Sequence, residues 1–239
     1  MPPSIPPPKL HPISWLFIDV GGVLLDDAPL LDELYRFIVE ALITHGKPVT
    51  LPEVLAQRER MIHSGAASVY KSVLRHFAPD DTLFDQILGD FRRWLEPRQK
   101  ELNPMFPGVP DALAKLSAEY NLALAANQGA YIHQILEELN IRRYFSSAFL
   151  SGEMGLTKPE ELFFIKMLES TGCAVEEGVM IGDNLVNDLR PANRLGMRTV
   201  RVRAGADNVQ DDGAYTFVTG TVSSMAELPD LFRSWRSVN

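Results

Sequence analysis

Short apolar runs that alternate with helical stretches are the feature that most constrains this chain. Four such runs occur, at residues 15–18, 122–126, 178–181 and 199–202. Apolar runs of this length, bounded by small or polar residues, are typical of strands buried on both faces of a parallel sheet. Strands that alternate with helices form an α/β fold whose ligands bind at the carboxyl ends of the strands. The sequence therefore predicts a parallel α/β core with a site at that edge.

The stretch from residue 27 to residue 104 interrupts this alternation. Apolar residues recur there at helical spacing, for example Leu31, Leu34, Tyr35, Ile38 and Leu42,. Thr50 and Glu53 have the spacing of a capping box in front of a second helix,. We predict helices at 29–46, 51–65, 66–77 and 82–96. They would form an all-helical cap at 27–104, inserted into a core made of 14–26 and 105–239. In that core we predict helices at 160–171 and 225–235 and an edge strand at 216–222.

Composition argues against several classes of protein. The chain of 239 residues carries 23 Lys and Arg against 31 Asp and Glu, which gives a net charge of −8. Nucleic-acid backbones recruit clustered Lys and Arg, so we expect no nucleic-acid partner. No apolar run reaches the ~20 residues that a membrane-spanning helix needs, so we expect no membrane partner either. The oligomeric state does not follow from the sequence.

The lone cysteine and the proline-rich start of the chain have separate consequences. Cys173 alone forms neither an intrachain disulfide nor a thiolate-rich zinc site, which indicates a reducing, cytoplasmic location,. Prolines dominate residues 1–13, and these residues contain no apolar signal-peptide region,. We therefore predict a disordered tail there.

Acidic side chains follow two of the predicted strands. Asp19 ends the first run and precedes Gly21 and Gly22, whose missing side chains let backbone N–H groups approach an anion,. Asp183 follows the third run, and Asp188 lies five residues further on. A buried carboxylate is costly unless a cation or hydrogen bonds offset its desolvation. Two carboxylates at neighbouring strand tips form a hard-oxygen site suited to Mg²⁺, although Asp183 or Asp188 could instead cap a helix.

Three polar residues complete the set of candidates. Lys158 stands before Pro159 and ahead of the predicted helix at 160–171. There it could neutralise charge on a carboxylate nucleophile and on a bound phosphoryl group. Asn127 and Gln128 follow the second run, where their amides could donate to ligand oxygens or could simply belong to a turn,.

Together these motifs resemble the haloacid dehalogenase-like hydrolase superfamily. The resemblance covers 14–235 and rests on Asp19-x-Gly-Gly-Val-Leu, Asn127, Lys158-Pro159 and Gly182-Asp183-Asn184-x-x-Asn187-Asp188. The insertion after the first motif is similar to the branch with a helical cap between motifs one and two. The resemblance implies a Rossmann-like parallel sheet core with an inserted all-helical cap.

The resemblance also implies a mechanism. Asp19 would be the nucleophile of a phosphatase that acts on a small phosphorylated metabolite through an aspartyl-phosphate, and Lys158 would assist it. The Mg²⁺ ligands would be Asp19, the Gly21 carbonyl and Asp183, with Asp188 and Asn184 in support. The substrate-binding residues would be Gly22, Asn127, Gln128 and Lys158.

Two positions depart from the pattern of the superfamily. Its phosphatases usually carry a second aspartate, a general acid and base, two residues after the nucleophile, where this chain has Gly21. They usually carry Ser or Thr before the asparagine of motif two, where this chain has Ala126. Positioned acid–base catalysis is worth about 10²–10⁴-fold, so the first loss matters. Asp26 is the nearest replacement, although a structural role fits it better.

These departures keep two alternatives to a phosphatase open. One is a binding or regulatory protein that retains the fold and pocket but has lost turnover, as Gly21 and Ala126 would suggest. The other is a metal-free 2-haloacid dehalogenase that uses the same nucleophile on a carbon–halogen bond. Asp183 and Asp188 argue against the dehalogenase, because paired carboxylates favour a metal ion.

Overall fold

A single parallel sheet forms the centre of the protein. The computed structural model describes residues 12–66, 68–205 and 215–236, and six strands of these residues lie in the order β3-β2-β1-β4-β5-β6. The strands are β1 (Trp15–Ile18), β2 (Asn121–Ala126), β3 (Ser147–Leu150), β4 (Gly178–Gly182), β5 (Arg198–Val202) and β6 (Gly220–Val222). Every neighbouring pair is parallel. The predicted Rossmann-like core is confirmed.

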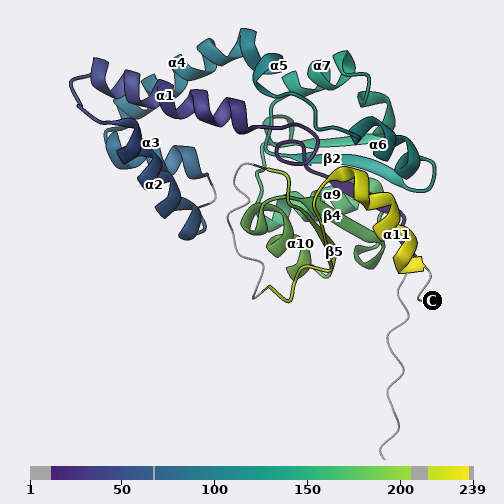
Figure 1. Cartoon of the computed structure of the whole chain (residues 1–239). Coiled ribbons are helices and arrows are strands. Elements are labelled where there is room, and N and C mark those ends of the chain that lie inside the picture. Colours follow the sequence, from purple (N-terminus) through teal and green to yellow (C-terminus); the bar gives the residue numbers. More distant parts are fainter. Residues whose placement is uncertain (1–11, 67, 206–214, 237–239) are drawn as a thin grey trace, which may run out of the picture.

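Helices cover both faces of this sheet (Figure 1). The longer ones are α6 (Val109–Ser117), α7 (Tyr131–Glu138), α9 (Glu161–Thr171) and α11 (Leu228–Arg236). The shorter ones are η2 (Arg142–Tyr144), α8 (Ser151–Met154), η3 (Val175–Glu177), the π-helical turn η4 (Leu185–Leu189), α10 (Arg190–Arg194) and η5 (Met225–Glu227). Side chains of a strand alternate between its faces, so Leu16 and Ile18 belong to one apolar cluster and Phe17 to the other,.

Four further helices follow β1 and stand beside the sheet in Figure 1. They are α1 (Ala28–Thr44), α2 (Leu51–His63), α3 (Val69–Phe77) and α4 (Asp81–Leu95), and we call them the helical cap. The short helices η1 (Glu96–Arg98) and α5 (Gln99–Leu102) lead back to the core. The cap has an apolar cluster of its own, with Leu42 and Val54 fully buried in it. The boundaries at 27 and 104 stay a prediction.

Local sequence signals explain where the cap helices begin. The Thr50 N–H and hydroxyl both donate to Glu53 Oε2 at 2.7 Å, so the predicted capping box forms at the start of α2,. The Asp80 side chain accepts a hydrogen bond from the Leu83 N–H at 3.0 Å at the start of α4,. Satisfying these N–H groups lets each helix begin at the position that its sequence indicates.

Other expectations from the sequence differ from the structure. We did not predict β3, because only Phe149 and Leu150 of its four residues are buried and its apolar pattern is short. The predicted edge strand at 216–222 is restricted to Gly220–Val222. Most of the predicted tail, residues 1–11, and most of the polar loop after β5, residues 206–214, lie outside the described residues. Among the helices that the structure describes, none has the length and apolar content to cross a membrane.

Candidate active site

The register of the sheet brings the tips of neighbouring strands to one edge. β1 lies between β2 and β4, with Ile18 opposite Leu124 on one side and opposite Ile181 on the other. The Asp19 N–H extends this pattern by donating to the Ile181 carbonyl at 2.9 Å. Asp19 and the residues that follow β2 and β4 therefore share one edge, as parallel topology requires.

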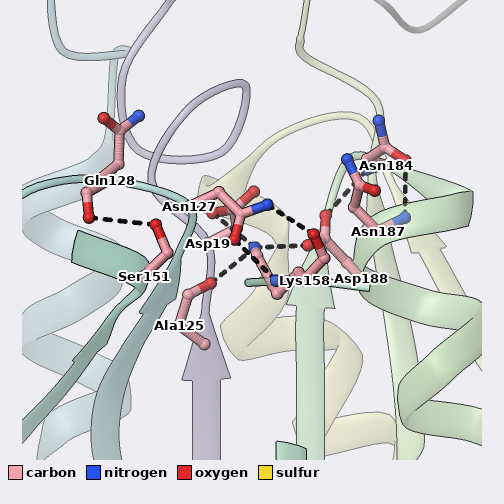
Figure 2. A network of polar contacts seen from close by, with 9 residues as sticks. All are labelled: Asp19, Ala125, Asn127, Gln128, Ser151, Lys158, Asn184, Asn187 and Asp188. Atoms are coloured by element: carbon pink, nitrogen blue, oxygen red, sulfur yellow. Dashed lines mark hydrogen bonds and ion pairs between the residues drawn. The ribbon is translucent and has the colours of Figure 1, made fainter. Parts of the chain in front are cut away.

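Lys158 is the centre of a buried hydrogen-bond network at that edge (Figure 2). Its ammonium donates to Asp19 Oδ1 at 2.9 Å, to Asp188 Oδ1 at 2.5 Å and to the Ala125 carbonyl at 2.7 Å. An ammonium has three N–H donors, so these acceptors satisfy it. Burial alone would lower the pKa of Lys158, but the charges of Asp188 and Asp19 outweigh it and raise the pKa above its usual value,. Lys158 therefore keeps a positive charge next to the Asp19 carboxylate.

Asn127 holds Lys158 in this position. Its side-chain oxygen accepts a hydrogen bond from the Lys158 N–H, and its side-chain nitrogen donates to the Lys158 carbonyl, both at 2.8 Å. The two bonds tie the tip of β2 to the segment that precedes α9. The substrate contact that we expected of Asn127 stays a prediction, and positioning Lys158 is a role that its sequence position did not indicate.

Asp183 completes a cluster of carboxylates. Among the described residues, Asp19, Asp183 and Asp188 each offer an oxygen, and these oxygens lie within 4.8 Å of one another. Burial raises the pKa of Asp183 well above its usual value, and the negative charges of Asp188, Asp19 and Asp27 raise it further,. Clustered hard-oxygen donors with an excess of negative charge are the donor set that suits Mg²⁺.

Asp188 lies next to these groups in a fully buried position. While its Oδ1 accepts from Lys158, its Oδ2 accepts from the Asn184 N–H at 3.1 Å. Asn184 Oδ1 in turn accepts from the N–H groups of Val186 and Asn187, both at 2.9 Å, and so starts η4. Burial is the main reason that the pKa of Asp188 is raised. Because both its oxygens accept hydrogen bonds from the chain, Asp188 is better placed to support the site than to bind a cation.

Two glycines make room for the Asp183 carboxylate. Gly22 has a φ of +68°, which only glycine adopts without strain, and a Cβ there would collide with the Asp183 side chain,. A Cβ on Gly205, beyond β5, would collide with the same carboxylate. We missed Gly205, although a glycine shortly after a strand at the same sheet edge was an available signal. The Gly22 N–H donates to the Leu25 carbonyl at 2.8 Å, and its substrate contact stays a prediction.

Gln128 lies beside the Lys158 network rather than in it (Figure 2). Its side-chain oxygen accepts a hydrogen bond from the Tyr131 hydroxyl. Its carbonyl accepts from the Gly152 N–H at 3.0 Å and from the Ser151 hydroxyl at 3.4 Å. These bonds fix the turn after β2 against the start of α8. The substrate contact that we expected of Gln128 stays a prediction.

The two aspartates after β1, Asp26 and Asp27, make different contacts. Asp26, which we named as the nearest replacement for an aspartate at position 21, accepts a hydrogen bond from the Ala28 N–H at 3.0 Å. That bond is structural, as we expected. Asp27, which sequence reasoning passed over, has its Oδ2 3.5 Å from the position that a Cβ on Gly21 would occupy. The doublet of aspartates was visible in the sequence, but only the fold shows which one reaches Gly21.

Comparison with known proteins agrees with this arrangement. Residues 19–202 match the family of haloacid dehalogenase-like hydrolases. The chain belongs to this family. A glyceraldehyde 3-phosphate phosphatase from Methanocaldococcus jannaschii is 36% identical over 233 residues, which are 93% of this chain and 98% of the relative. A protein of the same name from Methanopyrus kandleri is 29% identical over 81% of this chain and 85% of its own length.

Solved structures share the fold of this haloacid dehalogenase-like hydrolase. A phosphatase of this type from Thermococcus onnurineus has a TM-score of 0.64 at 20% identity, over 92% of this chain and 97% of its own. A hydrolase of this type from Bacillus subtilis, bound to magnesium, has a TM-score of 0.67 at 17% identity, over 92% and 99%. These structures share the fold, and the match of residues 19–202 to the family confirms the resemblance that the motifs indicated.

Proposed function

We propose that this haloacid dehalogenase-like hydrolase is a Mg²⁺-dependent phosphatase of small phosphorylated metabolites. The observation that carries the proposal is the buried contact between Lys158 and Asp19, with the Asp183 carboxylate beside it. Phosphoryl transfer depends mainly on positioning and on fixed charges, which this arrangement supplies. The names of the relatives from M. jannaschii and M. kandleri make glyceraldehyde 3-phosphate the first substrate to test. A cytoplasmic location stays a prediction from the lone cysteine.

The chain's own residues would divide the chemistry between them. Asp19 attacks phosphorus while the ester bond to the leaving alcohol breaks, and water later hydrolyses the aspartyl-phosphate. Lys158 keeps its charge, because the carboxylates around it hold its proton, and stabilises the negative oxygens of the transferring group,. Asn127 keeps Lys158 in place through its two hydrogen bonds.

The residues of the site fit Mg²⁺. Three clustered carboxylates and the raised pKa of Asp183 describe a place where negative charge exceeds positive charge. We propose that Asp19, the Gly21 carbonyl and Asp183 bind the ion, while Asp188 and Asn184 support them. When bound, the ion neutralises charge on the phosphoryl group.

Phosphate release from an aryl phosphate and from glyceraldehyde 3-phosphate tests the proposal. We expect Asp19→Asn to lower kcat by several orders of magnitude, because it removes the nucleophile. We expect EDTA to abolish the activity of the wild type and added Mg²⁺ to restore it. Asp85→Asn on the exposed side of α4 is the matched control and should leave activity unchanged. Turnover that survives both EDTA and Asp19→Asn would contradict the proposal.

The same assays separate the two alternatives. Tight binding of phosphate esters by the wild type, without hydrolysis of any ester in a broad set, would favour a binding or regulatory protein. Chloride release from a 2-haloacid in the absence of divalent cations would favour a dehalogenase. Either result would replace the phosphatase as the function of the site that Asp19 and Lys158 form.

A further inference from the structure

The leaving oxygen of a phosphate ester needs a proton when its bond to phosphorus breaks. Alkoxides are poor leaving groups, and a positioned acid accelerates such a step by about 10²–10⁴-fold. This chain has Gly21 where phosphatases of the superfamily usually carry that acid. We propose that Asp27 is the catalytic acid and base of this enzyme, an inference that rests on the proposed phosphatase function.

The Asp27 carboxylate lies beside the position that a side chain on residue 21 would occupy. Its Oδ2 is 3.5 Å from the position of a Cβ on Gly21, which is ordinary van der Waals contact. The backbone at Gly21 does not have the positive φ of Gly22, so the conformation there does not require glycine,. A methyl group would therefore fit at position 21, and the Asp27 carboxylate lies beside the point from which a longer side chain there would extend.

The start of α1 shows that Asp27 is directed to the site and not to the helix. Asp27 occupies the N-cap position of α1, where an aspartate side chain commonly accepts a hydrogen bond from the first turn,. Here its side chain makes no such cap bond. Asp26 accepts from the Ala28 N–H instead, and the Asp27 carbonyl accepts from the Leu31 N–H at 2.9 Å. The backbone of Asp27 thus begins the helix, while its carboxylate turns towards Gly21.

The other carboxylates near the strand tips have different tasks. Asp27 is one of three whose charges raise the pKa of Asp183, so it lies within electrostatic range of the site. Of the other two, Asp19 contacts Lys158 and is the proposed nucleophile, and Asp188 is buried with both oxygens hydrogen-bonded. Asp27 is not among the described carboxylates grouped closely enough to share one cation. Asp27 is therefore the carboxylate near the site to which we assign proton transfer.

Main-chain pairing fixes the segment that carries Asp27. Leu25 forms an antiparallel bridge with Met105, which lies on the segment that returns from the helical cap. Next to it, the Asp26 N–H donates to the Pro104 carbonyl at 2.8 Å. The segment that leaves the core for the cap and the segment that returns from it are therefore joined by main-chain hydrogen bonds. Asp27 follows directly on this pairing, so its distance from Gly21 is set by the core.

The two half-reactions balance with Asp27 as the only proton carrier. In the first, an Asp19 oxygen forms a bond to phosphorus, the ester P–O bond breaks, and the Asp27 carboxyl proton passes to the leaving oxygen. In the second, water attacks the phosphorus of the aspartyl-phosphate, the Asp27 carboxylate takes a proton from that water, and the bond to Asp19 breaks. The products are an alcohol and phosphate, and both side chains return to their starting states.

The dependence of rate on the leaving group tests this role. For an alkyl phosphate that the wild type hydrolyses, beginning with glyceraldehyde 3-phosphate, we expect Asp27→Asn to lower kcat/KM by about 10²–10³-fold. For 2,4-dinitrophenyl phosphate, whose phenolate leaves without a proton, kcat/KM should change less than about threefold. The second half-reaction still lacks its base, so the variant should release a burst of dinitrophenol close to one equivalent of enzyme.

Two further variants separate catalysis from structure. Asp26→Asn is the matched control, and its ratio of kcat/KM between the two esters should equal that of the wild type. Asp27→Ser removes the acid and shortens the side chain, so adding Gly21→Asp to it places a carboxylate beside the same point and should recover at least about tenfold of the alkyl-ester kcat/KM,. If Asp27→Asn does not fold, Asp27→Ser takes its place in the comparison of the two esters.

The possible failures are distinguishable. Equal losses on the two esters, no loss on either, or no recovery with Gly21→Asp would overturn the role of Asp27 while the phosphatase remains. A wild type without any Asp19-dependent turnover of either ester would overturn the proposed phosphatase, and the role of Asp27 with it.

Discussion

The floor of the site and its rim are held by different forces. The floor is built by the sheet, where the buried Lys158 ammonium has three acceptors and the Asp188 side chain is 0% exposed. The rim is the segment from β1 to α1, where Asp27 is only half-buried and is placed by the main-chain bridge between Leu25 and Met105. Charge and burial fix the floor, and backbone pairing fixes the rim. A residue of the rim is therefore easier to exchange without unfolding the protein than a residue of the floor.

Among the changes to the floor and the rim, removing the charge of Lys158 should cost the most unfolding free energy. Lys158→Met leaves the buried Asp188 without its cation, and removing one partner of a buried ion pair costs about 3–5 kcal/mol of unfolding free energy,. The pKa of Asp188 is already raised to about 7, whereas the unfolded chain ionises it near its ordinary value of 3.8. Lys158 lowers the pKa of Asp188 in the folded protein, so its removal raises that pKa further, and the stability of the variant should fall as pH rises from 3.8 through 7, as denaturant unfolding would show,.

The matched control for this variant is an exposed ion pair. Lys166 contacts Glu169 at 2.7 Å with both side chains more than half exposed. Lys166→Met should cost less than about 1 kcal/mol, because solvent screens such a pair. Similar losses for Lys158→Met and Lys166→Met would contradict the description of the floor as a buried, charge-dependent network.

Substitutions that create a cavity in the cap or in the core test whether these two parts unfold separately. Leu42 in α1 and Leu124 in β2 are both 0% exposed. Either change to Ala should cost about 2–5 kcal/mol in local or global stability. We expect Leu42→Ala to speed amide hydrogen exchange in α1–α4 before the sheet is affected, and Leu124→Ala to speed exchange in β1 and β2. Uniform acceleration over the whole chain by Leu42→Ala would show that cap and core unfold as one unit.

The smallest expected effect concerns the helix starts of the cap. Asp80→Ala removes the side-chain bond to the Leu83 N–H and should cost about 1 kcal/mol in the same unfolding assay,. Ser68 also occupies an N-cap position, at the start of α3, but makes no side-chain cap bond. Ser68→Ala should therefore change stability by much less than Asp80→Ala. A reversed order would mean that packing, and not capping, decides where these helices begin.

Much of the fold could be predicted because hydrophobic patterns are local. The continuous apolar runs at β1, β2 and β4 gave their positions to within one residue. The spacing of Leu34, Ile38 and Leu42 gave the buried face of α1. β3 was not predicted because half of its residues are only partly buried, so its apolar run is too short to differ from that of a loop. A strand in which only two consecutive residues are buried has neither a continuous apolar run nor an alternating pattern long enough to reveal it,.

The sequence by itself determined which chemical groups end the strands, namely the carboxylates of Asp19 and Asp183, and that Lys158 stands before a helix. Only the tertiary structure decided that Asp27, and not Asp26, lies beside Gly21. The physical reason is that strand and helix periods are set by neighbours along the chain. The distance between side chains from separate segments depends on sheet register and on how each connection turns, which the pattern of residues does not encode locally.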